Sequence, residues 1–214
     1  MATVKTISGT AIASVKTVSG VAIASVKTVN GIDAVVPWVL TPSGLWIGDT
    51  PSFTLDTGTV TADASDVNIR TASSFIAASQ DFDFQMLCGT WPATAGHGLI
   101  IGFSPNLTGT GAQAPGTTNP IMYAKNAAVA DGWMNDNDAV DGAQAAGWMS
   151  ELTIGISRRG DTFYGLIDNA LDHTFTGDTG TDAGNLFIGA PGAGSGYSAT
   201  VIRYRLGPNL PAIS

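Results

Sequence analysis

The clearest pattern along the chain is an alternation of apolar and polar residues in short runs. In Phe82–Cys88, every second side chain is apolar, and Cys88 closes the series. The same period of two appears in Glu151–Arg158 and in Thr200–Leu206. Successive side chains of a strand point to opposite faces of its sheet, so this period predicts strands with one buried face. We expect Cys88 to be a small, buried, apolar residue.

From Pro37 onward, clusters of Gly, Pro, Asn and Asp separate short apolar runs. Such clusters indicate turns, and the runs between them are strand candidates. The candidates are Leu45–Gly48, Val67–Thr71, Phe82–Cys88, Leu99–Phe103, Ile121–Ala124, Glu151–Arg158, Thr162–Asp168, Leu186–Gly189 and Thr200–Leu206. Because sheets of this strand count tend to split into two packed layers, the pattern predicts an all-β, two-sheet antiparallel sandwich. Arg158–Asp161 lies between two candidates and is predicted to be a hairpin turn.

Composition supports this fold class. Charged residues are 12% of the 214 residues, against roughly 25% in average domains. Glycine occurs 27 times, whereas Glu151 is the only glutamate and there are four lysines. Glutamate and lysine are strong helix formers, and their scarcity excludes a helix bundle, a coiled coil and a doubly wound α/β fold.

The first 36 residues carry a repeat of 11 residues. Val4–Ser14 is followed by Val15–Ser25, and a third copy begins at Val26. An 11-residue period also suits a right-handed helical supercoil, but the central Gly and the many Val, Ile and Thr residues disfavour helix. Eleven is odd, so a turn has to reset the strand register in each copy. The turn dipeptides are Ser8-Gly9, Ser19-Gly20 and Asn30-Gly31, which predicts strand, turn and strand in every repeat.

Strand pairs this short bury too little surface to be stable alone. Residues 1–36 are therefore predicted to be an assembly segment that packs against copies of itself or against another protein, with a flexible tether as the alternative. The apolar positions assigned to assembly are Val4, Ile7, Val15, Val18, Val26 and Val29. Residues 37–214 are predicted to form the sandwich domain.

Charge is unevenly divided along the chain. Residues 1–36 hold three lysines and one aspartate, and the remainder holds six basic and sixteen acidic residues, for a net charge of −8. An acidic body repels phosphate backbones, so no nucleic-acid partner is expected. No apolar run reaches the ~20 residues of a membrane span, and the N-terminus lacks the apolar core of a signal peptide. We expect no membrane span, synthesis in the cytoplasm, and no disulfide, because Cys88 is alone.

Two parts of the chain resemble known families. The V-K-T-V-S/N-G-V-A-I-A-S segments of residues 4–31 resemble short repeats near the N-termini of bacteriophage tail and fibre proteins. Leu152–Asn169 resembles the central hairpin of concanavalin-like lectin and glucanase jelly rolls, although Asp168-Asn169 stands where Asp-Gly is commoner. Leu186–Gly189 and Val201–Leu210 resemble the closing strands of the same families. The resemblances imply a virion component attached through its N-terminus, and a jelly roll of a kind that in many members binds carbohydrate.

The carboxylates argue against an enzyme. Retaining glycosidases of the jelly-roll families need an acid and a nucleophile about 5–5.5 Å apart, usually two carboxylates on one strand. Glu151 is the only glutamate, and the strand after it contains no second carboxylate. Asp81 and Asp83 flank the start of a strand, where exposed carboxylates are ordinary. His97 and His173 lack the spacing of a hydrolase triad or a zinc site, so the sequence predicts a non-enzymatic protein.

The densest candidate binding chemistry lies in residues 131–149, between two copies of Gly-Trp-Met. Closely spaced carboxylates and amides in a loop suit Ca²⁺, although the spacing is not that of an EF-hand. The segment is either a solvated polar turn or a calcium site formed by Asp136, Asn137, Asp138 and Asp141. Its tryptophans either pack in the core or stack on sugar rings, and the candidate carbohydrate-binding residues are Trp133, Trp148 and Asn137.

Together these features favour a virion structural protein of a phage fibre, tail or head decoration, made in the host cytoplasm. Residues 1–36 would bind copies of the same chain, with trimers expected of fibre-like parts, and other virion proteins. The lectin-like sandwich would be displayed outward, with host surface glycans as candidate partners. The alternative is a bacterial lectin-like adhesive or carbohydrate-binding module tethered by the repeat. A polysaccharide-cleaving enzyme is the weakest hypothesis, because the carboxylate pair is missing.

Overall fold

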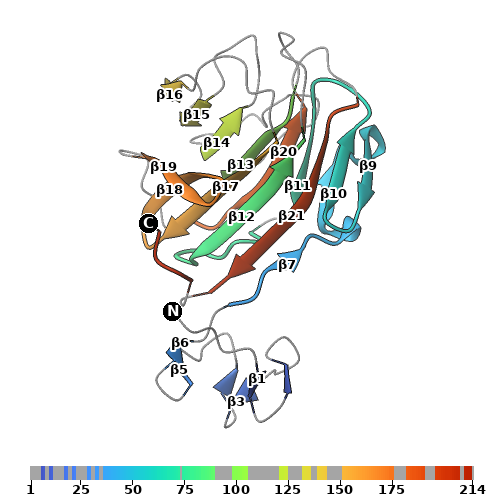
Figure 1. Cartoon of the computed structure of the whole chain (residues 1–214). Helices are drawn as coiled ribbons and strands as arrows, with labels where there is room; N and C mark the ends of the chain where they lie inside the picture. Colours follow the sequence, from blue (N-terminus) through green and yellow to red (C-terminus); the bar gives the residue numbers. More distant parts are fainter. Residues whose placement is uncertain are drawn as a thin grey trace.

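The fold is a sandwich of two antiparallel sheets, as the sequence predicted (Figure 1). The computed structural model describes six two-residue strands within residues 6–33, and then residues 36–72, 74–89, 98–105, 121–124, 132–135, 139–143, 151–175, 182–190, 196–207 and 210–213. Helical structure in this part of the chain is limited to the 3-10 turns η3 (Ser43–Leu45) and η4 (Thr50–Ser52). None of its helices has the length and apolar character needed to cross a membrane.

One sheet has eight strands, in the order β19-β18-β17-β12-β21-β10-β9, with β7 also pairing with β21. The strands are β7 (Val39–Leu40), β9 (Phe53–Asp56), β10 (Thr59–Ala62), β12 (Phe82–Cys88), β17 (Leu152–Arg159), β18 (Thr162–Ile167), β19 (Ala170–Phe175) and β21 (Ser198–Leu206). Strands far apart in the sequence therefore lie side by side, because β12 is bordered by β17 and β21.

The other sheet has seven strands, in the order β16-β15-β14-β13-β20-β11-β8. They are β8 (Trp46–Gly48), β11 (Val67–Thr71), β13 (Ile100–Ser104), β14 (Ile121–Ala124), β15 (Gly132–Asn135), β16 (Ala139–Ala143) and β20 (Asn185–Ala190). Every strand candidate named from the sequence overlaps a strand of one of the two sheets.

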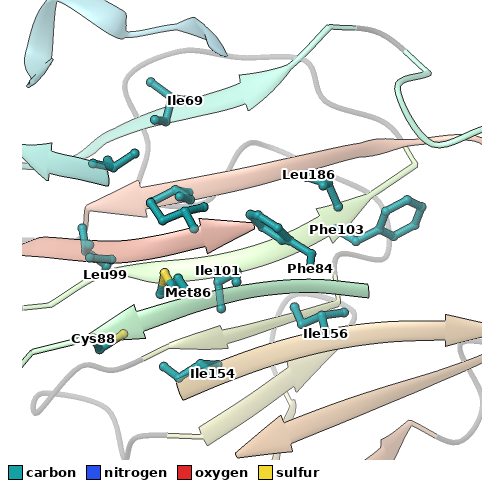
Figure 2. Close-up of a cluster of buried hydrophobic side chains, with 14 of the residues drawn as sticks. Ile69, Phe84, Met86, Cys88, Leu99, Ile101, Phe103, Ile154, Ile156 and Leu186 are labelled. Atoms are coloured by element: carbon teal, nitrogen blue, oxygen red, sulfur yellow. The ribbon is translucent and has the colours of Figure 1, made fainter. Parts of the chain in front are cut away.

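The hydrophobic core fills the space between the sheets (Figure 2). Phe84 and Met86 of β12 contribute to it from the eight-stranded sheet, and Ile101 and Phe103 of β13 contribute from the seven-stranded sheet. Cys88 is also fully buried there, which confirms the prediction made from its place in the alternation.

The β17–β18 hairpin turns later than the sequence indicated. β17 continues through Arg159, which pairs with Thr162, so only Gly160 and Asp161 form the connection. Gly160 has a φ of +63°, which glycine adopts at little cost. The assignment of Arg158 to the turn was therefore wrong, because its side chain lies on the inward face of β17 and is 0% exposed.

Arg158 is held under the core by carbonyl groups and aromatic rings. Its guanidinium donates to the carbonyls of Ala77, Gln80 and Asp182 at 2.7–2.9 Å. The guanidinium carbon lies 5.5–5.8 Å from the ring centroids of Phe82, Phe103 and Phe163. Burial lowers the pKa of Arg158, and the nearby charges of Asp81 and Asp182 oppose that shift. The cation thus fixes two loops against the end of the core.

Each N-terminal repeat forms its own two-stranded antiparallel sheet, which matches the predicted strand pairing. The pairs are β1 (Thr6–Ile7) with β2 (Thr10–Ala11), β3 (Thr17–Val18) with β4 (Val21–Ala22), and β5 (Thr28–Val29) with β6 (Ile32–Asp33). Among the assembly residues, Ile7, Val18 and Val29 end the first strand of each pair, whereas Val4, Val15 and Val26 lie outside the described residues.

Candidate functional site

The candidate site lies on the outer face of the eight-stranded sheet, where β17, β12 and β21 are neighbours (Figure 1). The alternation that turns the aromatic residues of β12 inward turns Asp83 and Gln85 outward. The registers place these two side chains in polar rows that cross three strands. The rows are Ser157–Asp83–Arg205 and Gly155–Gln85–Arg203.

Asp83 is the centre of the first row, and its side chain is only 2% exposed. Its Oδ1 accepts a hydrogen bond from the Ser157 hydroxyl at 2.6 Å and lies 2.8 Å from Nη2 of Arg159. Its Oδ2 accepts from Nε of Arg205 at 2.6 Å. The sequence had suggested an ordinary exposed carboxylate at a strand start. That interpretation was wrong, because partners on two neighbouring strands cover the group.

Gln85 is the centre of the second row. Its Nε2 donates to Oδ1 of Asn169 at 2.9 Å, and its Oε1 accepts from Nε and Nη2 of Arg203 at 3.3 and 3.0 Å. Gly155 makes room for this side chain, because a Cβ at that position would lie 3.0 Å from Cγ of Gln85. Asn169 belongs to the β18–β19 turn, where it and Asp168 both have positive φ. Tolerance of that conformation is the property for which turns select Asn and Asp.

Trp38 joins the two rows at the β7 side of the sheet. The guanidinium carbons of Arg203 and Arg205 lie 4.4 and 4.3 Å from its ring centroid, within the range of cation–π contacts. Burial lowers the pKa of Arg203, and the like charge of Arg205 lowers it further. Arginine nevertheless remains charged at neutral pH, so the aromatic ring holds two neighbouring cations.

The C-terminal segment closes the other side of the site. The Pro211 carbonyl accepts from Nε and Nη2 of Arg159 at 3.2 and 3.0 Å. A cleft of about 160 Å³ remains, which we call the arginine cleft; it is lined by Trp38, Asp83, Gln85, Arg159, Leu166, Asn169, Arg205, Pro211, Ala212 and Ile213. It is smaller than the ~300–1,000 Å³ of sites for drug-sized ligands, so its size suits one small polar ring.

The arginine cleft can bind a ligand through hydrogen bonds. Among its described lining residues Asp83 is the only carboxylate, and two arginines and a serine already occupy its oxygens. Besides Asp83, its polar side chains are guanidinium groups, which donate to hydroxyl and anionic oxygens, and amide groups, which donate to such oxygens and also accept from hydroxyl groups.

The structure corrects the carbohydrate-binding assignment of Trp133. Its side chain is 0% exposed, its indole Nε1 donates to Oδ2 of Asp172 at 2.7 Å, and its ring meets Phe175 edge-on at 5.8 Å. An indole enclosed in this way presents no face to a sugar. Trp133 instead packs in the core, which was the alternative weighed from the sequence.

Of the other predicted site residues, the structure describes only Asp141. Asp141 lies on β16, where its backbone pairs with that of Trp133 on β15. The remaining predicted residues, which lie outside the described part of the chain, are Asp136, Asn137, Asp138 and Trp148. Within the described part, no group of three or more His, Cys, Asp or Glu residues could hold a metal ion. The calcium site therefore stays a prediction.

Sequence reasoning found only part of the arginine cleft. The shared face of Arg203 and Arg205 was visible in the alternation of the last strand, opposite Ile202, which is fully buried. The contacts of Arg205 with Asp83 and of Arg203 with Gln85 were not visible, because β12 and β21 are more than a hundred residues apart and their pairing is not encoded locally.

No family model matches the sequence, and no curated protein matches it significantly. Solved structures do share the fold. A mutant form of the carbohydrate recognition domain of Emp46p has a TM-score of 0.54 and 8% identity over 78% of this chain and 90% of its own. The potassium-bound form of the same domain has a TM-score of 0.52 and 10% identity over the same shares. A native glycosidic hydrolase has a TM-score of 0.50 and 12% identity over 83% of this chain and 98% of its own.

Identities this low show the fold alone. The chain therefore has the concanavalin-like jelly-roll sandwich found in both lectin domains and glycoside hydrolases, and the choice between binding and catalysis depends on its own residues.

Proposed function

We propose that this protein is a non-catalytic carbohydrate-binding protein that holds a sugar residue in the arginine cleft. The observation that carries the proposal is a small polar cleft on the outer face of a jelly-roll sheet, lined by amide and guanidinium groups. Such groups match the hydroxyl and ring oxygens of a sugar. The shared fold with the carbohydrate recognition domain of Emp46p supports the same function class.

The same cleft argues against hydrolysis, although a glycosidic hydrolase is among the structures of similar fold. Glycoside hydrolysis by the usual route needs a pair of carboxyl groups beside the scissile bond. Asp83 is single among the described lining residues and engaged by two cations, and the sole glutamate, Glu151, is exposed just before β17. We therefore assign binding without cleavage.

For the N-terminal segment we propose assembly into a phage virion, as part of a fibre, tail or head decoration. The support is the resemblance of residues 4–31 to phage repeats, together with the separate two-residue strand pairs, which bury little by themselves. Homo-oligomers, with trimers as the expected form, and other virion proteins are the proposed partners, and host glycans are the proposed ligands. A bacterial lectin-like adhesive would use the same cleft but attach its repeats to a cell surface.

The test is binding of the full-length chain to a glycan array, with and without a calcium chelator. Binding without release of reducing ends is expected, and loss of binding with chelator would assign calcium to the site. Absence of binding in both conditions would refute the carbohydrate role, and release of reducing ends would establish an enzyme.

Two glycine variants of one turn locate the binding site. Asn169→Gly removes an amide that lines the cleft but keeps the left-handed backbone, and should weaken binding about tenfold. Asp168→Gly alters the neighbouring turn position, whose side chain accepts from the Thr153 amide and does not line the cleft, and should leave affinity unchanged. Equal effects of both variants would place the sugar elsewhere.

A further inference from the structure

The hydrogen-bond donors of Arg205 are only partly used by the protein. Its Nε donates to Asp83, while the terminal nitrogens make no hydrogen bond or ion pair to any described residue. The side chain is only 13% exposed, and it lines the arginine cleft. A guanidinium has more N–H groups than this one contact uses, and N–H groups removed from water need an acceptor. The unused donors of Arg205 therefore require an acceptor in or beside the cleft.

The charges of the site do not balance either. Arg159 and Arg205 share the single carboxylate of Asp83. Arg203 contacts the neutral amide of Gln85 and has no ion pair within the described residues. Among its described residues, the site thus holds three guanidinium groups and one carboxylate, on a chain whose net charge is −8.

Nearby carboxylates outside the cleft serve other groups. Asp81 accepts from the Gly160 amide at the β17–β18 turn, and Asp168 accepts from the Thr153 amide. Neither residue lines the cleft. The excess positive charge on this face therefore has no counterpart among the described cleft residues.

We propose that the ligand of the arginine cleft is an acidic sugar whose carboxylate lies against the terminal nitrogens of Arg205. This inference rests on the proposed function and narrows its substrate class. A planar carboxylate matches the guanidinium fork with two parallel hydrogen bonds, and Arg203, which shares the Trp38 ring with Arg205, adds a second positive charge nearby. The amides of Gln85 and Asn169 remain beside the cleft for ring hydroxyls. A neutral sugar would offer the arginine donors only hydroxyl and ring oxygens, which form weaker hydrogen bonds than a carboxylate does.

The test is calorimetric titration of the full-length chain with single sugars at low and high salt. Glucuronic, galacturonic and N-acetylneuraminic acids are the acidic probes, glucose and galactose are the neutral probes, and glucose 6-sulfate supplies a different anion. At least one acid should bind about tenfold more tightly than any neutral probe, and salt should weaken that binding. The sulfate should bind more weakly than that acid.

Variants then assign the carboxylate contact. Arg203→Gln removes a charge but leaves both ion pairs of Asp83 intact, and should weaken binding of the acid several-fold more than binding of the neutral probes. Arg205→Lys keeps the charge but loses the planar guanidinium fork, and should weaken binding of the acidic sugar about tenfold. Arg70→Gln on β11 removes the same charge from the other sheet and should have no effect. Thermal melts verify that each variant is folded.

The outcomes separate this inference from the proposed function. If glycans bind but neutral sugars bind as tightly as acids, or if Arg203→Gln behaves like Arg70→Gln, the acidic ligand is refuted and carbohydrate binding stands. If glucose 6-sulfate equals the best acid, the carboxylate assignment is refuted. If no glycan or single sugar binds, both proposals fail.

Discussion

At the residue scale, Arg158 shows how the alternation of side chains along a strand can place a cation on the face where apolar side chains are expected. It follows Leu152, Ile154 and Ile156 on the inward face of β17 and ends that row under three phenylalanine rings. Its cost of burial is offset by hydrogen bonds to the carbonyls of Gln80 and Asp182 and to that of Ala77, which also accepts from the Gln80 amide. The residue is therefore structural, although it is adjacent in sequence to a cleft arginine.

Replacement of this arginine should destabilise the whole sandwich. Arg158→Met keeps much of the side-chain volume but removes the arginine hydrogen bonds to the carbonyls of Gln80, Asp182 and Ala77, so the free energy of unfolding should fall by about 3 kcal/mol. Urea denaturation followed by tryptophan fluorescence measures the loss. Arg70→Met, at a half-buried arginine of β11, is the matched control and should lose less than about 1 kcal/mol. Equal losses would show that the carbonyl network contributes little.

Gly165 is a second residue whose identity follows from a contact across the core. A Cβ on this inward-facing position of β18 would lie 2.4 Å from the indole of Trp133, which the core encloses. Gly165→Ala should therefore reduce the free energy of unfolding by about 1–3 kcal/mol, because a packed core cannot absorb the methyl group. Gly44→Ala is the control, since no atom lies within 4 Å of its added Cβ. A neutral Gly165→Ala would show that the indole can move aside.

At the element scale, β21 departs from regular strand geometry at one point. Its pairing with β12 shifts register between Gln85 and Leu87, and Val201 in this stretch has a φ of +49°. A β-branched residue in the left-handed region is strained, by roughly 1–2 kcal/mol. The register shift lies next to the paired residues Gln85 and Arg203, so the regular pairing of β12 with β21 stops at the second polar row.

Relief of this strain should stabilise the protein. Val201→Asn places a residue that tolerates positive φ at a site that is 42% exposed, so the free energy of unfolding should rise by about 1 kcal/mol. Val39→Asn is the matched control, because Val39 is 44% exposed and its φ is not positive. Urea denaturation measures both variants. Their changes in the free energy of unfolding should be of opposite sign or should differ by about 1 kcal/mol. Identical shifts would mean that the backbone at Val201 stores no strain.

The strands also show which parts of the fold the sequence could predict. Alternation is local, so it located long strands such as Phe82–Cys88 and assigned their buried faces correctly. It missed β19, whose residues are mostly exposed, and the two-residue β7, which no periodicity can show. It also missed the short strands β9, β10, β15 and β16. Strand order is not local, because cross-strand partners such as Asp83 and Arg205 are distant in sequence. The cleft consists of such partners and therefore emerged only from the structure.

At the scale of the whole molecule, the chain combines a sandwich that has its own hydrophobic core with three strand pairs that do not extend its sheets. Each of those pairs consists of two two-residue strands, so the surface that it can bury by itself is small compared with the backbone entropy of ordering it. In the proposed assembly, copies of the segment on several chains would supply the missing contacts. The assembly would also strengthen binding by a small cleft, because linked sites bind together.

Self-assembly through the repeats is therefore the last prediction. The full-length chain should show a multiple of its 21.8 kDa mass in light scattering, independent of whether sugar is present. The triple variant Ile7→Asn, Val18→Asn and Val29→Asn removes the apolar residue that ends the first strand of each pair and should return the mass to that of one chain. Its affinity for a single sugar should be unchanged, whereas its binding to a dense glycan surface should fall by about 10²-fold or more. A full-length chain that is monomeric at all concentrations would refute the assembly role, because no second copy of the segment would then pack against it.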